Sequence, residues 1–83
     1  MDSQKETTAT IRGRLSVLKK GLLSEANSVE YYRTLVANTP EDTEDNIGIR
    51  RMYGDLMLEE QKHVQRFKEM ITYWEKQLET LGG

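Results

Sequence analysis

The sequence predicts an all-α protein, an antiparallel hairpin of two long helices that forms one domain over residues 1–83. Apolar residues recur at alternating steps of four and three, the spacing of one helix face, and no stretch shows the alternation of a strand. The only proline, Pro40, lies in "ANTPEDTEDNIG", where turn-forming and acidic residues interrupt this pattern. We therefore expect helices at about residues 8–38 and 46–80, joined by a loop at about 39–45.

The first helix carries one row of inward-facing residues with a single polar member. The row is Ile11, Leu15, Leu18, Leu22, Glu25, Val29, Tyr32 and Val36. Its steps match the seam of a coiled coil, in which these positions pack against a partner helix. Glu25 therefore occupies a position where the pattern demands Ile or Leu.

The second helix carries a similar row with two consecutive polar members. The row is Ile49, Tyr53, Leu56, Glu60, His63, Phe67, Met70, Trp74 and Leu78. Antiparallel helices face each other at equal distances from their loop, so a loop at 39–45 places Glu25 level with Glu60 and His63. The three polar residues should therefore meet between the helices.

Composition excludes several classes of function. The net charge is −2, so no basic surplus favours binding to nucleic acid or to an anionic membrane. Cysteine is absent, which excludes disulfides and thiolate metal sites. No apolar run approaches the roughly 20 residues of a membrane span, and the polar N-terminus has no signal-peptide core. We expect a soluble cytoplasmic protein.

Metal binding explains the three polar residues together. A single polar residue on a seam often only sets the register of the helices. Two carboxylates at one level of a core repel each other, and a cation between them removes this penalty. Glu60 and His63 form the Glu-x-x-His pair of di-iron bundles. Oxygen and imidazole ligands suit Fe, Mn²⁺ also fits them, and the lack of thiolates disfavours structural zinc.

The ligand count predicts that two copies of the chain share one centre. A di-iron bundle uses four carboxylates and two histidines. The chain offers two seam carboxylates, and His63 is its only histidine. We therefore expect two hairpins to form a four-helix bundle by dimerisation, with the metal ions on or near the two-fold axis.

The motifs "EANSVEYY" (Glu25 to Tyr32) and "EQKH" (Glu60 to His63) resemble those of the ferritin-like superfamily, which includes rubrerythrins. The short two-helix form with one Glu-x-x-His is most similar to the encapsulated ferritins. The resemblance covers roughly residues 15–75. It departs from the family at Ser24 and Asn27, where acidic residues form a metal entry site, and at Tyr31, where the family has Trp. No encapsulin-targeting tail is recognisable after Leu81.

The resemblance implies a ferritin-like ferroxidase that oxidises Fe²⁺ with O₂ or H₂O₂ at a di-iron centre between subunits. It implies Glu25, Glu60 and His63 as the metal-binding and catalytic residues. It also implies dimers within a larger ring such as a decamer, carried as cargo inside an encapsulin nanocompartment for iron storage and detoxification.

Several neighbouring residues and two other functions remain open. Tyr32 and Tyr53 could hydrogen-bond the site carboxylates, or could be core aromatics. Asp55, Glu59 and Glu30 fit a solvated helix surface better than metal ligation. A rubrerythrin-like peroxidase is one alternative function. The other is a non-enzymatic helical oligomerisation module, in which the polar residues only set register.

Overall fold

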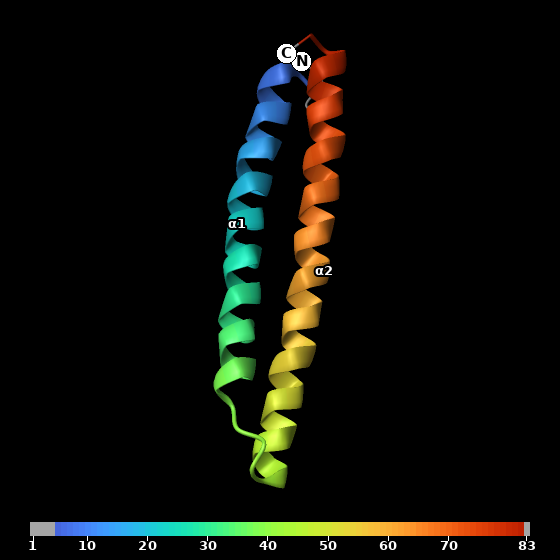
Figure 1. The fold of residues 1–83 in the computed structure, drawn as a ribbon. Coiled ribbons are helices and arrows are strands. Elements are labelled where there is room, and N and C mark those ends of the chain that lie inside the picture. The colour runs from blue at the N-terminus through green and yellow to red at the C-terminus, as the bar shows by residue number, and fades with distance from the viewer. Residues whose placement is uncertain (1–4, 83) are drawn as a thin grey trace.

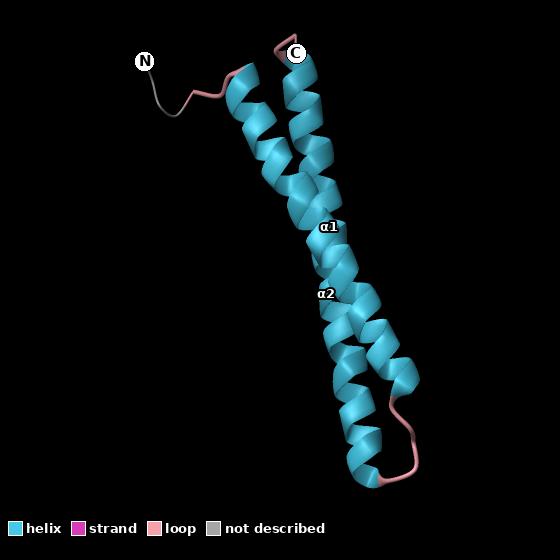
Figure 2. Ribbon diagram, turned by 90° about the vertical axis from the view of Figure 1, so that its left-hand side faces the viewer, coloured by secondary structure: helices cyan, strands magenta, loops and turns pink. Residues whose placement is uncertain are grey.

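The computed structural model describes residues 5–82 and shows two antiparallel helices, α1 (Thr8–Asn38) and α2 (Glu44–Thr80). The helices lie side by side and cross at a shallow angle (Figures 1 and 2). Because they are antiparallel, the start of α1 and the end of α2 lie at the same end of a rod. The rod measures 62 × 19 × 14 Å. Residues 5–82 contain no strand, which confirms the predicted all-α hairpin.

The helix ends follow from capping residues. α1 has the predicted range, and the Thr7 side chain accepts a hydrogen bond from the backbone N–H of Thr10 at 3.1 Å. α2 begins at Glu44, two residues earlier than expected, because Thr43 Oγ1 accepts a hydrogen bond from the Asn46 N–H at 3.1 Å. Two acidic residues in the first turn also favour this start. The loop therefore covers residues 39–43 rather than 39–45.

Arg50 ties the loop to both helices, a contact that the sequence did not predict. Its Nε donates a hydrogen bond to the Val36 carbonyl at 3.1 Å, near the end of α1. Its guanidinium also forms an ion pair with Glu41 in the loop. These contacts satisfy one of the last carbonyls of α1 and help to keep α2 in register with it.

The core is small and lies mainly in the half of the rod near the chain ends. The predicted inward row of α1 is confirmed, because each of its members is buried or half-buried. Ile11 and Leu15 pack with Ile71 of α2, and the partly buried residues around them are Leu18, Leu22, Trp74 and Leu78. Within residues 5–82 the only buried residues are Ile11, Leu15, Ile71 and Val29. One hairpin therefore leaves much of its apolar surface uncovered.

The predicted inward row of α2 is partly wrong. Two of its members, Ile49 and His63, are exposed, and the residues that follow them, Arg50 and Val64, are half-buried in their place. The other members are half-buried as expected: Tyr53, Leu56, Glu60, Phe67, Met70, Trp74 and Leu78. Ile71 is 9% exposed, whereas Ile49 is 45% exposed. The apolar stripe of α2 is wide, and a single partner helix covers only one side of it. His63 therefore lies at an edge of the hairpin.

The helices approach closely beside the site. A Cβ atom added at Gly21 would collide with the Phe67 ring, so glycine allows this ring to lie directly against α1. Gly13 has no neighbour within 4 Å of the equivalent position. The contact between Gly21 and Phe67 thus defines the spacing of the helices one turn from Glu25.

Candidate metal centre

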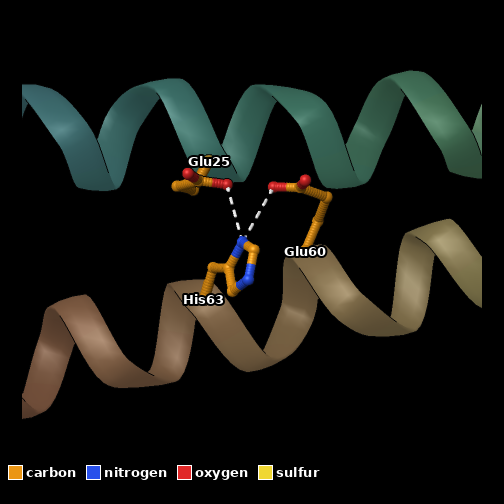
Figure 3. A group of neighbouring side chains, drawn as sticks. All are labelled: Glu25, Glu60 and His63. Atoms are coloured by element: carbon orange, nitrogen blue, oxygen red, sulfur yellow. Dashed lines mark ion pairs between the residues drawn. The ribbon is translucent and has the colours of Figure 1, made fainter.

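Glu25, Glu60 and His63 converge at the middle of the hairpin, as the sequence predicts (Figure 3). Glu25 projects from α1, while Glu60 and His63 project from successive turns of α2. His63 Nδ1 lies 3.6 Å from Glu25 Oε2 and 3.7 Å from Glu60 Oε2. One ligand atom from each residue lies within 4.8 Å of the others. The site is thus assembled by the antiparallel register of the two helices.

The three side chains differ in burial in a way that opens the site on one side. The side chains of Glu25 and Glu60 are 26% and 23% exposed, whereas that of His63 is 50% exposed. The carboxylates therefore lie between the helices, and the imidazole stands at the rim. An incoming group can reach the site from the side on which His63 lies.

The electrostatics of the site disfavour two ionised carboxylates without a cation. The Glu25 carboxyl raises the pKa of Glu60, because neutral Glu60 can donate a hydrogen bond to it. Partial burial and the negative charge of Glu25 raise this pKa further, and His63 opposes the rise. Within residues 5–82, Glu60 Oε2 is a buried atom without a hydrogen-bond donor. An ionised Glu60 is therefore an unsatisfied acceptor.

The spacing of the trio suits an ion better than direct hydrogen bonds. An N–H···O hydrogen bond spans about 2.7–3.2 Å, so His63 Nδ1 is too far from either carboxylate to form one. Ligand atoms that are each about 2.1 Å from a common ion lie up to about 4.2 Å apart. The two distances from Nδ1 fall inside this limit, and the Glu25 and Glu60 oxygens lie within 4.8 Å of each other. The donors, two carboxylate oxygens and one imidazole nitrogen, match hard to intermediate cations such as Fe²⁺ and Mn²⁺.

Tyr32 and Tyr53 lie at a different level from the carboxylates. Each is seven residues from the glutamate on its own helix, which corresponds to about 10 Å along the axis. Their ring centroids are 6.5 Å apart, so they pack against each other across the helices. Within residues 5–82 neither hydroxyl forms a hydrogen bond with a site carboxylate. The structure supports a packing role for them.

The remaining acidic residues near the site face solvent. Glu30 pairs with Arg33 at 3.4 Å, and Glu59 pairs with Lys62 at 3.2 Å, each on the surface of one helix. Asp55 is exposed as well. The structure thus brings together Glu25, Glu60 and His63, which the sequence places on the seams. Glu30, Asp55 and Glu59 lie outside this site.

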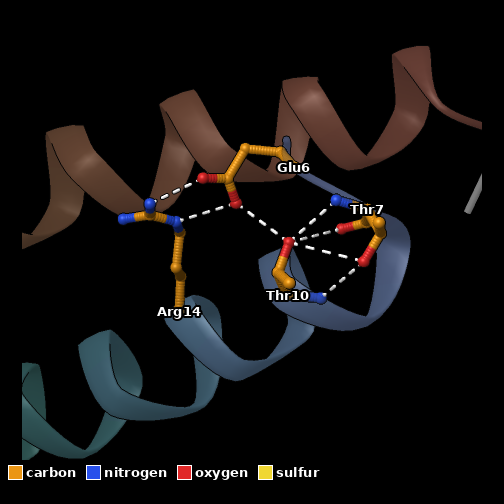
Figure 4. A network of polar contacts seen from close by, with 4 residues as sticks. All are labelled: Glu6, Thr7, Thr10 and Arg14. Carbon is orange, nitrogen blue, oxygen red and sulfur yellow. Dashed lines mark hydrogen bonds and ion pairs between the residues drawn. The ribbon is translucent and has the colours of Figure 1, made fainter. Parts of the chain in front are cut away.

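A second polar cluster, at the start of α1, serves as a contrast to the candidate metal centre (Figure 4). Glu6 accepts hydrogen bonds from the Thr10 hydroxyl at 2.9 Å and from Arg14 at 2.6 Å. The Arg14 guanidinium also lies 4.4 Å from the centroid of the Trp74 ring. Every carboxylate oxygen of Glu6 has a donor. This cluster is a helix cap whose carboxylate oxygens all accept hydrogen bonds, whereas Glu60 Oε2 has no donor.

Neither α1 nor α2 combines the length and apolar character needed to cross a lipid bilayer. No protein-family model, no curated protein and no solved structure matches this chain. Its function has to be inferred from the candidate metal centre and from the motifs that resemble those of encapsulated ferritins.

Proposed function

We propose that this protein binds Fe²⁺ through Glu25, Glu60 and His63 and oxidises it to Fe³⁺ at a di-iron centre shared between two copies of the chain. One observation carries the proposal: two partly buried carboxylates and an imidazole converge at one level, and Glu60 Oε2 is buried without a donor. A bound cation would neutralise the carboxylates and would supply the partner that Glu60 lacks.

The donor set favours iron as the substrate. Carboxylate and imidazole ligands bind Fe²⁺, and carboxylates also stabilise the more highly charged Fe³⁺. Thiolates, which would favour zinc or an iron–sulfur cluster, are absent because the chain has no cysteine. Mn²⁺ fits the same ligands and competes with iron.

A second copy would complete the centre. One hairpin supplies half of the four carboxylates and two histidines of a di-iron bundle. The exposed rim at His63 leaves the site open to such a partner. The two copies would then form a four-helix bundle whose metal ions lie near the two-fold axis.

The oxidation balances with a small oxidant. Two Fe²⁺ ions give up one electron each, and the two electrons with two protons convert O₂ to H₂O₂ or H₂O₂ to two waters. In this scheme Glu25 and Glu60 hold the ions close together and neutralise their charge. His63 binds through Nδ1, the nitrogen that faces the carboxylates.

Storage of the oxidised iron would need a separate container. A rod of 62 × 19 × 14 Å has no interior large enough for a mineral. The resemblance to encapsulated ferritins suggests an encapsulin shell as this container and a ring of dimers as the cargo. Co-expression with an encapsulin shell, followed by purification of intact shells, tests whether the protein is retained inside them.

The enzymatic part of the proposal is tested by iron oxidation. Fe²⁺ is added without oxygen, air is admitted, and the absorbance of Fe³⁺ is followed. We expect Glu25→Ala and His63→Ala to slow the oxidation at least about tenfold, since they remove ligands. Glu30→Ala is the matched control, because Glu30 is an exposed carboxylate on the same helix. Equal rates in all four proteins would refute the proposal.

The oxidant distinguishes a ferroxidase from a peroxidase. The same assay is repeated with H₂O₂ in the absence of O₂. Faster turnover with O₂ supports a ferroxidase, and turnover restricted to H₂O₂ supports the rubrerythrin-like alternative. A protein that purifies without metal and binds none would instead be an oligomerisation module.

A further inference from the structure

We infer that a second copy of this chain docks on one edge of the hairpin, with the two α2 helices antiparallel and the two-fold axis close to His63. We call this surface the histidine edge. It is the flank on which His63 lies, and its exposed large side chains are Val17, Tyr31, Ile49, Met52 and Tyr73. The inference rests on the proposed function, because the half-site at this edge requires ligands from another molecule.

Helical spacing and a groove place these residues on one side. Residues seven apart lie in one row of a helix in a two-helix pair. Ile49 and Met70 are thus in the row of His63, and Tyr31 is in the row of Val17. A groove of about 400 Å³ joins the two rows, since its lining includes both Val17 and Met70.

The other flank of the hairpin is poorer in apolar groups. A groove of about 160 Å³ there is lined by Ala26, Val29, Glu30, Gln61 and Val64. A further groove of about 600 Å³ includes Leu58 and Gln61, and its other lining residues are all polar or charged. The exposed large apolar side chains of this other flank are Leu23 and Leu58. The flank with more exposed large apolar side chains is therefore the side on which the candidate metal centre is open, which favours this side for the partner.

The outer row of the histidine edge on α2 is self-complementary when it is reversed. This row contains Met52, Glu59, Arg66 and Tyr73, each seven residues from the next. An antiparallel copy places Glu59 against Arg66 of the partner and Met52 against Tyr73 of the partner. The midpoint of the row falls between residues 62 and 63, beside His63. Such pairing of a surface with itself is the geometry of a two-fold interface.

The charged residues of this row, Glu59 and Arg66, have few ion-pair partners within one hairpin. Among residues 5–82 Arg66 forms no ion pair, and Glu59 pairs only with the exposed Lys62 of its own helix. A two-fold axis along the rod would instead set α2 against α1 of the partner at equal levels. Because Glu25 is level with Glu60, Arg66 would then be level with residue 19, where the α1 row on this edge offers Val17 and Ser24 and no carboxylate. Charge complementarity therefore favours the antiparallel pairing of α2 with α2.

Disulfide trapping tests the arrangement, and the natural chain has no cysteine to interfere. The variant Met52→Cys/Tyr73→Cys places two exposed thiols 21 residues apart, or about 31 Å along one helix, so they cannot pair within a chain. We expect mild oxidation to give a covalent dimer. The control Arg51→Cys/Thr72→Cys has the same spacing in the neighbouring row, away from the histidine edge. Trapping in the control alone, in both variants equally, or in neither would overturn the inference.

A charge exchange tests the same contact without cysteine. We expect Arg66→Glu to weaken the dimer about tenfold or more, because it places like charges opposite each other, and Glu59→Arg/Arg66→Glu to restore it. Equal dimer affinities in the three proteins would contradict the proposed pairing. Both experiments are run in chelator and with Fe²⁺. If the disulfide forms and the charge exchange restores the dimer but the protein does not oxidise iron, the proposed function is refuted and the docking inference stands. If the protein oxidises iron but the disulfide does not form, the docking inference is refuted and the proposed function stands.

Discussion

At the scale of single residues, Glu60 is the carboxylate of the candidate site whose pKa the fold raises. Glu25 and partial burial raise its pKa, so the folded protein holds this proton more tightly than the unfolded chain does. The stability that comes from the bound proton is complete below the ordinary pKa of a glutamate. It is lost as the pH rises through the higher pKa of the folded state.

This sign predicts that Glu60→Gln stabilises the metal-free protein near neutral pH. The amide carries no charge beside Glu25 and can donate a hydrogen bond, so we expect the free energy of unfolding at pH 7 to rise by about 1 kcal/mol. Near pH 4 the parent and the variant should converge. Urea denaturation in chelator at both pH values measures the difference. If the free energy of unfolding depends on pH in the same way in the two proteins, the fold does not raise the pKa of Glu60.

The residues of the site were predictable because each interrupts a regular pattern. Glu25 and Glu60 replace apolar residues on seams that face each other, and a short loop fixes the level at which they meet. The position of His63 at the rim was not predictable. Both the row that contains His63 and the row one residue later are largely apolar, and the periodicity alone does not say which row faces α1.

At the scale of the helices, the contact of α1 with α2 beside the site depends on Gly21. The Phe67 ring occupies the space that a Cβ atom would need, whereas the corresponding space at Gly13 is empty. Both glycines are inside α1, so alanine improves helix propensity equally at the two positions. The difference between the two substitutions therefore isolates the packing cost.

We expect Gly21→Ala to be less stable than Gly13→Ala by about 1–3 kcal/mol, the usual cost of overpacking. Thermal or urea unfolding of the metal-free proteins gives the comparison. If the two variants are equally stable, Phe67 can move away without cost and the close approach does not define the helix spacing.

Helix lengths followed from the sequence more directly than helix orientation did. The range of α1 and the end of α2 match expectation, since long periodic segments and a single proline-containing break leave few alternatives. The start of α2 differed by two residues, because several residues near it could act as caps. The brace formed by Arg50 depends on a contact across the loop, for which the sequence has no local signal.

At the scale of the whole molecule, one hairpin has a small core and half of the ligands that a di-iron bundle uses. Only four of the described residues are buried, and large apolar side chains are exposed on the histidine edge. The candidate metal centre, open on that same edge, has half of the ligands that a di-iron site would need. Dimerisation would address both deficits at once, which is why we attribute the function to a pair of chains.

The most direct test of this account combines native mass with iron content. The parent, His63→Ala and the control Glu30→Ala are loaded with Fe²⁺ without oxygen and measured before and after chelation. We expect the parent and the control to be dimers with two iron ions, which chelation removes, and His63→Ala to hold fewer ions. A parent protein that is monomeric with iron, or a dimer that never binds iron, would contradict the shared centre.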